Sequence, residues 1–245
     1  MKIIGIIPAR YASTRFPGKP LADIKGKSMI RRVYEQAVKA PSLNQVIVAT
    51  DDQRIYEHVT SWGGKVIMTS PNHTSGTDRC KEVLEHQKNH FDVVVNIQGD
   101  EPYIDPSQIE SLINSFENKE TQIASLAKKI SSEEELFNPN SVKVVIGENE
   151  QALYFSRAAI PFLRGVEKKD YLSHTDFYKH LGLYAYRADV LVEISHLAVA
   201  KLEKAESLEQ LRWLSAGYKI HMQFTTIEGL SVDTPEDLLK LTNKA

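Results

Sequence analysis

Three cationic side chains follow the first apolar run of the sequence and could together bind a polyanion. The run at residues 3–7 is rich in isoleucine, which predicts a strand buried on both faces of a parallel sheet. Arg10, Arg15 and Lys19 follow its carboxyl end, where ligands bind in open α/β sheets. Because such cations bind phosphate oxygens, the loop predicts a triphosphate site, with a solvated surface loop as the alternative. Four residues that set the backbone conformation favour a shaped loop: Pro8, Pro17, Gly18 and Pro20.

Neither of the two common nucleotide-binding loops fits these residues. A Walker A loop needs Gly where this chain has Ser13, and Ser or Thr where it has Pro20. The dinucleotide fingerprint G-x-G-x-x-G is also missing, because Gly5 is followed by I-I-P-A-R. The sequence therefore excludes a P-loop and disfavours a dehydrogenase.

Two carboxylates are candidates for a metal site. The predicted strand at residues 91–98 leads into Q-G-D-E-P, in which Gly99 permits a close approach and Asp100 offers a hard oxygen ligand for magnesium. The alternative is a turn in which Asp105 caps the next helix, but that leaves Asp100 unexplained, so we favour the metal role. Asp233 precedes Thr234, the predicted cap of the last helix, and has no local role, so it is the expected partner of Asp100.

The stretch S-G-T-D-R at residues 75–79 predicts the start of a helix that runs to about His90. Thr77 suits the N-cap position, and the free amides of a helix start suit a phosphate or a base edge. Capping alone and ligand binding explain this stretch equally well. Arg79 is the residue there that we would test.

The elements that position these side chains predict an α/β fold. Strands and helices alternate over the first half of the chain, which indicates right-handed crossovers and a mostly parallel twisted sheet with helices on both faces. From residue 122 onward the pattern becomes mixed or antiparallel, with a hairpin around residues 148–150. We expect one domain over residues 1–245, with a core at 1–130 and 177–245 and a hairpin and excursion at 131–176. The charged excursion is a candidate homodimer contact at about residues 156–176.

Composition limits the partners and the compartment. The 245 residues carry a formal net charge of −2, which gives no global attraction to nucleic acid or to an anionic membrane. The single Cys80 excludes an internal disulfide framework and fits a reducing compartment. The apolar start is too short for a signal sequence, and no apolar run approaches the length of a membrane span. We therefore expect a cytoplasmic protein with small-molecule substrates.

Two polar residues of the second half have ordinary structural explanations. His180 lies on a predicted strand at 178–187, where a histidine is usually a structural residue. Gln210 fits a capping box that begins at Ser207. Local spacing alone gives neither residue a function.

The motifs together resemble a known family. They are I-P-A-R-Y-A-S-T-R-F-P-G-K-P, A-T-D-D, S-G-T-D-R, N-I-Q-G-D-E-P, N-P-N-S-V-K-V-V, A-L-Y-F-S-R, K-H-L-G-L-Y-A-Y-R, L-E-Q-L-R and V-D-T-P-E-D, in order from residue 5 to residue 237. This set is similar to the 3-deoxy-manno-octulosonate cytidylyltransferases, also called CMP-Kdo synthetases. Ser28, which is predicted to cap the helix that follows it, departs from the family pattern, which usually has Pro there, but either residue can start a helix. Cys80 replaces a usually aliphatic residue.

The resemblance implies a Rossmann-like nucleotidyltransferase fold and the reaction of CTP with 3-deoxy-D-manno-octulosonate (Kdo) to give CMP-Kdo and diphosphate, for lipopolysaccharide in a Gram-negative bacterium. It implies two Mg²⁺ ions, one held by Asp100 and Asp233 and one on the triphosphate. The implied nucleotide-binding residues are Arg10, Arg15, Lys19, Ser75, Gly76, Arg79 and Asp100, and the implied catalytic residues are Asp100, Asp233, Arg10 and Lys19. The implied sugar-binding residues are Gln98, Arg157, His180, Tyr184, Glu209 and Gln210, which replaces the local interpretations of His180 and Gln210.

Three alternatives stay open on the sequence. The same chemistry could act on an 8-amino Kdo analogue or a sialic acid, because a change at the far end of the sugar leaves no visible mark. A CTP-binding protein without turnover is the alternative from another class, although it would not need both Asp100 and Asp233. A dehydrogenase is the third and is disfavoured by the first loop.

Overall fold

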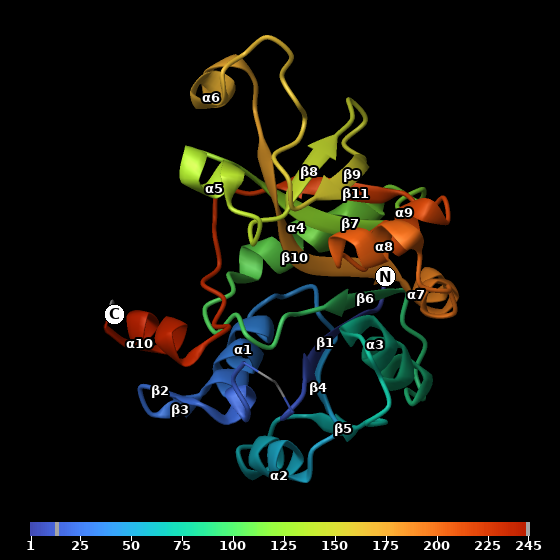
Figure 1. The fold of residues 1–245 in the computed structure, drawn as a ribbon. Coiled ribbons are helices and arrows are strands. Elements are labelled where there is room, and N and C mark those ends of the chain that lie inside the picture. The colour runs from blue at the N-terminus through green and yellow to red at the C-terminus, as the bar shows by residue number, and fades with distance from the viewer. Residues whose placement is uncertain (13–14, 244–245) are drawn as a thin grey trace. The chain divides into compact units, whose positions relative to one another are not determined.

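The structure, a computed structural model, describes residues 1–12 and 15–243 (Figure 1). The chain forms two compact units. Unit 1 comprises Met1–Ile113, Ala185–Ser195 and Gly229–Ala245, and unit 2 comprises Asn114–Tyr184 and His196–Glu228. The fold is α/β, with mostly parallel strands and surrounding helices, as the sequence predicts. None of the helices in the described part of the chain is long and apolar enough to span a membrane.

Unit 1 is built on parallel strands in the order β6-β1-β4-β5. Their bounds are β1 (Ile3–Ala9), β4 (Gln45–Thr50), β5 (Val66–Met68) and β6 (Val93–Asn96). The helices that alternate with them are α1 (Met29–Ala37), α2 (Gln53–Ser61), α3 (Gly76–Glu85), α4 (Pro106–Asn114) and α7 (Ala188–Ser195). The isoleucines of β1 are almost fully buried, so the expected central strand is confirmed.

The smaller elements of unit 1 frame the first loop. The 3-10 helix η1 (Lys19–Leu21) follows that loop and leads to a short antiparallel pair, β2 (Asp23–Ile24) and β3 (Lys27–Ser28). The last helix, α10 (Pro235–Asn243), also belongs to this unit. These parts are joined by a cluster of four buried side chains, Ile24, Met29, Val232 and Leu241. Phe16 of the loop packs against this cluster.

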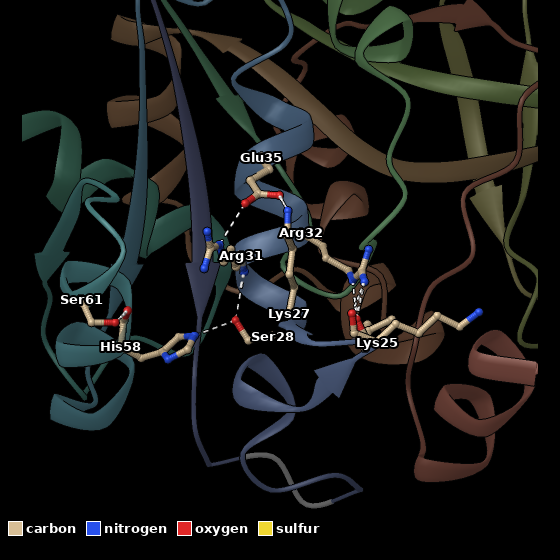
Figure 2. A network of polar contacts seen from close by, with 9 residues as sticks. Lys25, Lys27, Ser28, Arg31, Arg32, Glu35, His58 and Ser61 are labelled. Carbon is tan, nitrogen blue, oxygen red and sulfur yellow. Dashed lines mark hydrogen bonds and ion pairs between the residues drawn. The ribbon is translucent and has the colours of Figure 1, made fainter. Parts of the chain in front are cut away.

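Ser28 caps α1 and connects it to α2 (Figure 2). Its Oγ accepts a hydrogen bond from the Arg31 amide at 3.4 Å and lies 2.7 Å from Nε2 of His58, a residue of α2. On the same helix, Glu35 accepts from Lys27 Nζ at 2.6 Å and from Arg31 Nε at 2.9 Å. Ser28 therefore starts the helix by a side-chain cap, as predicted.

Unit 2 contains mixed strands. The strand β7 (Ile123–Lys129) pairs in parallel with β11 (Ile220–Phe224), and β10 (Tyr178–Arg187) pairs in antiparallel fashion with β8 (Lys143–Ile146). The predicted hairpin is confirmed by the antiparallel pair of β8 and β9 (Ala152–Ser156). The shorter helical elements are η2 (Ser115–Glu117), α5 (Glu133–Phe137), η3 (Lys168–Asp170), α6 (Tyr171–His174), α8 (Lys201–Glu206) and α9 (Gln210–Ser215).

Candidate active site

The two predicted metal-binding carboxylates lie around one lysine in unit 1. Lys19 Nζ is 2.8 Å from Oδ2 of Asp100 and 3.5 Å from Oδ1 of Asp233. Arg15 Nη2 lies 3.1 Å from the same Oδ1 of Asp233. The structure therefore brings together four of the side chains that the sequence singled out, from three separate stretches of the chain.

The backbone holds both carboxylates in place. The Val232 amide donates to the Asp100 carbonyl oxygen at 2.9 Å. Because Val232 directly precedes Asp233, this bond holds the backbones of the two carboxylate residues together. Thr234 and Asp237 then start α10 with reciprocal bonds, from the Thr234 amide to Asp237 Oδ2 at 3.1 Å and from the Asp237 amide to Thr234 Oγ1 at 3.3 Å. The cap of α10 and the backbone hydrogen bond between Val232 and Asp100 thus position Asp233.

The first loop is closed by its own backbone. The Gly18 amide donates to the Tyr11 carbonyl oxygen at 2.9 Å, and Gly18 has a φ of 72°, which favours glycine. Lys19 begins η1 directly afterwards, with Pro20 buried behind it. Arg10 is exposed at the end of β1. Lys19 therefore has a fixed backbone origin, whereas Arg10 is available to a ligand.

Gly99 allows a close contact with the protein itself. A Cβ on Gly99 would lie 2.7 Å from the Pro8 carbonyl oxygen, so only glycine fits here without a shift. The predicted close approach is thus made by the end of β1, which brings Asp100 next to the first loop. Gln98, a predicted sugar-binding residue, is half-buried just before Gly99 in unit 1.

The start of α3 differs from the sequence prediction. Ser75 is the N-cap, because its Oγ accepts from the Asp78 amide at 3.1 Å, and Gly76 is the first helical residue. Thr77 is not the cap and lies buried in the first turn. Both Ser75 and Thr77 have a capping hydroxyl, and the spacing did not distinguish them.

Arg79 is the most buried arginine that the sequence singled out, with 1% of the residue exposed. Its Nη1 donates to Thr69 Oγ1, and its Nη2 lies 3.0 Å from Oδ2 of Asp51. The guanidinium therefore joins α3 to the residues that follow β4 and β5. It supports the start of α3 from within the protein, while direct contact of Arg79 with a nucleotide stays a prediction.

The carboxylate pair fits a magnesium ion in its donor chemistry. Both side chains supply hard oxygen atoms, and both converge on a single cation, the Lys19 ammonium. Within residues 1–12 and 15–243, the structure has no group of three or more His, Cys, Asp or Glu side chains that could hold a metal. The protein would thus supply two ligands, and substrate oxygens and water the rest, as is usual for magnesium at phosphate sites.

His180 is a buried, neutral histidine of unit 2. Its Nε2 lies 2.9 Å from Ser125 Oγ, which also lies 2.9 Å from the Leu183 carbonyl oxygen. Because the carbonyl can only accept, the Ser125 proton points to it, and His180 then donates from Nε2. That tautomer leaves Nδ1 as an acceptor suited to a hydroxyl group. Burial lowers the pKa of His180 to about 3.

The depressed pKa of His180 predicts a pH-dependent stability. The folded value of about 3 lies below the unfolded value of 6.5, so the unfolded chain binds more protons as the pH falls. Stability should therefore decrease from about pH 6.5 downward, by about 2 kcal/mol at pH 5, since one pKa unit is about 1.4 kcal/mol. Urea unfolding of the wild type and His180→Gln at pH 7 and pH 5 measures this difference. An equal decrease in both proteins would contradict it, because the other histidines titrate in both.

Arg157 is bound by backbone carbonyl groups of unit 2. Its Nε donates to Glu206 O at 2.8 Å, its Nη1 to Pro139 O at 3.1 Å and its Nη2 to Ser207 O at 3.4 Å. The cation therefore satisfies the carboxyl end of α8, where positive charge is favourable. These carbonyl groups fix the orientation of the Arg157 guanidinium, which is the group predicted to contact the sugar.

The remaining sugar candidates lie together near α9. The Tyr184 ring is 5.1 Å from that of Trp213 and 5.3 Å from that of His180, measured between centroids. Burial raises the pKa of Tyr184, and the charge of Glu209 raises it further, which places that carboxylate near the phenol. Gln210 is buried and is the first residue of α9.

The predicted capping box at Ser207 is wrong. Ser207 ends α8 in the left-handed conformation, with a φ of 53°, and Glu209 occupies the N-cap position of α9 without a side-chain cap bond. The same residues that resemble a helix start are here the joint between two short helices. Gln210 therefore does not serve as a cap, which removes its local structural explanation.

Sequence reasoning missed the contacts of three polar residues. Asp51 stands in the motif A-T-D-D without a predicted role of its own, yet it pairs with Arg79, the buried arginine of α3. Ser125 is the one hydroxyl residue in the buried part of strand β7, and such a residue indicates a buried hydrogen bond, here to His180. Lys143 is fully buried and donates to the carbonyl groups of Asn138 and Ser141, a contact that no spacing reveals.

Known proteins resemble this chain along its whole length. The cytidylyltransferase family matches residues 4–220. The chain is 53% identical over 244 residues to 3-deoxy-manno-octulosonate cytidylyltransferase of Cytophaga hutchinsonii, covering 99% of this chain and 97% of that protein. The Parabacteroides distasonis enzyme of the same name is 56% identical over 244 residues, covering 98% and 96%.

A solved structure agrees with these relatives. The structure of CMP:2-keto-3-deoxy-manno-octonic acid synthetase complexed with CTP matches with a TM-score of 0.93 and 44% identity, and the match covers 100% of this chain and 98% of that one. The fold class predicted from the sequence is confirmed by this likeness. The chain therefore belongs to the cytidylyltransferase family, among the 3-deoxy-manno-octulosonate cytidylyltransferases.

Proposed function

We propose that the protein transfers CMP from CTP to Kdo and releases diphosphate, with magnesium, and so supplies an activated sugar for lipopolysaccharide. The observation that carries the proposal is the convergence of Asp100 and Asp233 on Lys19, beside Arg15. A protein that only bound CTP would not need this pair of carboxylates. The names of the relatives and the CTP of the matched synthetase support the substrate assignment.

The reaction needs one bond to form and one to break. The anomeric oxygen of Kdo bonds to the α-phosphorus, the bond from that phosphorus to the bridging oxygen breaks, and diphosphate leaves with the electron pair. The hydroxyl proton is released to solvent. Positioning and charge neutralisation account for most of the catalysis in such transfers. Arg10, Arg15 and Lys19 are proposed to bind the triphosphate and so to neutralise its charge.

A magnesium ion on the pair would be held by Asp100 and Asp233. When bound, it lowers the pKa of the attacking hydroxyl and attracts the phosphate oxygens. The backbone bond from the Val232 amide to the Asp100 carbonyl oxygen holds the two carboxylate residues next to each other, so that both would be placed to hold the ion. Ser75 and Gly76 are proposed to contact the nucleotide through the amino end of α3, where backbone amides favour anions.

The sugar acid is assigned to side chains of unit 2. Gln98, a residue of unit 1, is a separate predicted sugar contact. His180 offers Nδ1 as an acceptor for a hydroxyl group, while Glu209 and Gln210 supply further polar groups. Arg157 is proposed to attract the carboxylate of the sugar, and Tyr184 to contact the sugar with its phenol. A neutral His180 over the physiological pH range suits this role because it binds a hydroxyl without an added charge.

Diphosphate release from CTP with magnesium tests the proposal. Four reactions are compared: with Kdo, with its 8-amino analogue, with N-acetylneuraminate and without sugar. Release that depends on Kdo supports the proposal, and the ratio among the sugars identifies the acceptor. If folded protein that binds CTP releases no diphosphate with any of the sugars, it is a CTP-binding protein without turnover.

We also propose a homodimer through about residues 156–176. In this excursion Phe162 is 77% exposed. Tyr171 anchors the excursion, because its ring stacks on that of Phe177 with 5.7 Å between centroids and it shares a buried cluster with Ile130 and Leu136. We propose that Phe162 is the side chain that this excursion buries against the partner subunit. Light scattering at micromolar concentration should give the mass of a dimer, and the mass of a monomer would contradict the proposal.

A further inference from the structure

The charges of the carboxylate pair are already neutralised by side chains of the protein. Asp100 and Asp233 carry two negative charges, and Lys19 and Arg15 carry two positive charges within 3.5 Å of them. The Lys19 side chain is only 16% exposed, so water screens this contact less than a surface pair. A divalent cation therefore meets little net negative charge as long as both cations stay.

The ammonium and a metal would compete for the same two carboxylates. Lys19 Nζ contacts Oδ2 of Asp100 and Oδ1 of Asp233, and a magnesium ion would draw its protein ligands from these two side chains. We propose that Lys19 stands in for the metal in the free protein and moves to the triphosphate when the nucleotide binds. The inference rests on the proposed function for the identity of both ligands.

This exchange couples the two ligands. A triphosphate attracts Lys19 and Arg15 away from the carboxylates, and the uncovered carboxylates then attract the metal. By linkage, a metal on the pair also frees Lys19 for phosphate, so each ligand strengthens the binding of the other by the same factor. The flexible four-carbon side chain of lysine suits the movement, while η1 keeps its backbone in place. Lys19 also prevents repulsion between the carboxylates before the ligands arrive.

Binding of Mn²⁺ alone, followed by electron paramagnetic resonance, tests the exchange without turnover. Lys19→Met should bind Mn²⁺ about 10-fold more tightly than the wild type, which is within the usual range of such couplings. With metal removed by EDTA, the same variant should bind CTP about 10-fold more weakly. The matched control is Lys27→Met, which loses one positive charge from a pair with Glu35 in the same unit. It should leave both affinities unchanged.

The outcomes separate this inference from the proposed function. Mn²⁺ affinity that does not rise in Lys19→Met relative to Lys27→Met overturns the exchange, even if the wild type releases diphosphate with Kdo. If Lys19→Met binds Mn²⁺ more tightly but the wild type releases no diphosphate with any sugar, the exchange is supported and the proposed function is contradicted. Misfolding would lower Mn²⁺ affinity and so cannot imitate the expected result. If Lys19→Met does not fold, Lys19→Gln takes its place in the same measurements.

Discussion

Asp100→Asn should lower turnover by at least about 100-fold, the usual scale for the loss of one preorganised electrostatic group. The substitution keeps the shape of the side chain and removes its charge, so the metal would lose half of the negative charge that its two protein ligands supply. It also leaves Lys19 with Asp233 alone at 3.5 Å. Diphosphate release measured with CTP and Kdo under limiting magnesium gives the effect.

Asp105→Asn is the matched control for this variant. Asp105 lies five positions further along and caps α4, accepting from the Ser107 amide at 2.8 Å. Because Asn caps a helix about as well as Asp, turnover and stability should both stay near the wild-type values. Near-normal turnover of Asp100→Asn under limiting magnesium would remove Asp100 from the mechanism.

Arg79→Met should lower the free energy of unfolding by about 3 kcal/mol, because removal of one partner of a buried ion pair leaves the other charge unpaired. The unpaired group would be Asp51, whose side chain is 17% exposed. Thr69 would lose its hydrogen bond as well. Urea unfolding measures the change, and kcat/KM for CTP shows whether the start of α3 is displaced with it.

A double variant isolates the ion pair. Arg79→Met combined with Asp51→Asn should be less destabilised than the sum of the two single variants, because the second substitution removes the stranded charge. If Arg79→Met is as stable as the wild type but binds CTP poorly, the guanidinium serves the nucleotide directly, and our structural interpretation of the pair is wrong.

The parts of the fold that the sequence predicts are those set by local spacing. Ser28 and Thr234 are confirmed as caps because each precedes an apolar pattern with helical period. Spacing failed where two candidates compete, as at Ser75 and Thr77, and where one helix ends as another begins, as at Ser207. The spacing of capping residues does not predict that Ser207 adopts the left-handed conformation between α8 and α9.

The candidate site follows a similar division. Asp100 and Asp233 were predicted as partners because neither has a local role, and the structure brings both to Lys19. The pair of Arg79 with Asp51 was missed, since it depends on how α3 packs against the residues after β4. The surroundings of His180 were missed for the same reason, because Ser125 lies 55 positions away.

The contact between Arg15 and Asp233 joins residues 218 positions apart, near opposite ends of the chain. During synthesis on the ribosome, therefore, the amino-terminal strands can form long before the second carboxylate exists. A chain that stops before residue 233 lacks Asp233 and also lacks Leu241, one of the four side chains in the cluster against which Phe16 packs. Premature termination late in the message should thus yield a protein that retains most of its strands but has no complete carboxylate pair, so the proposed magnesium site would be completed last.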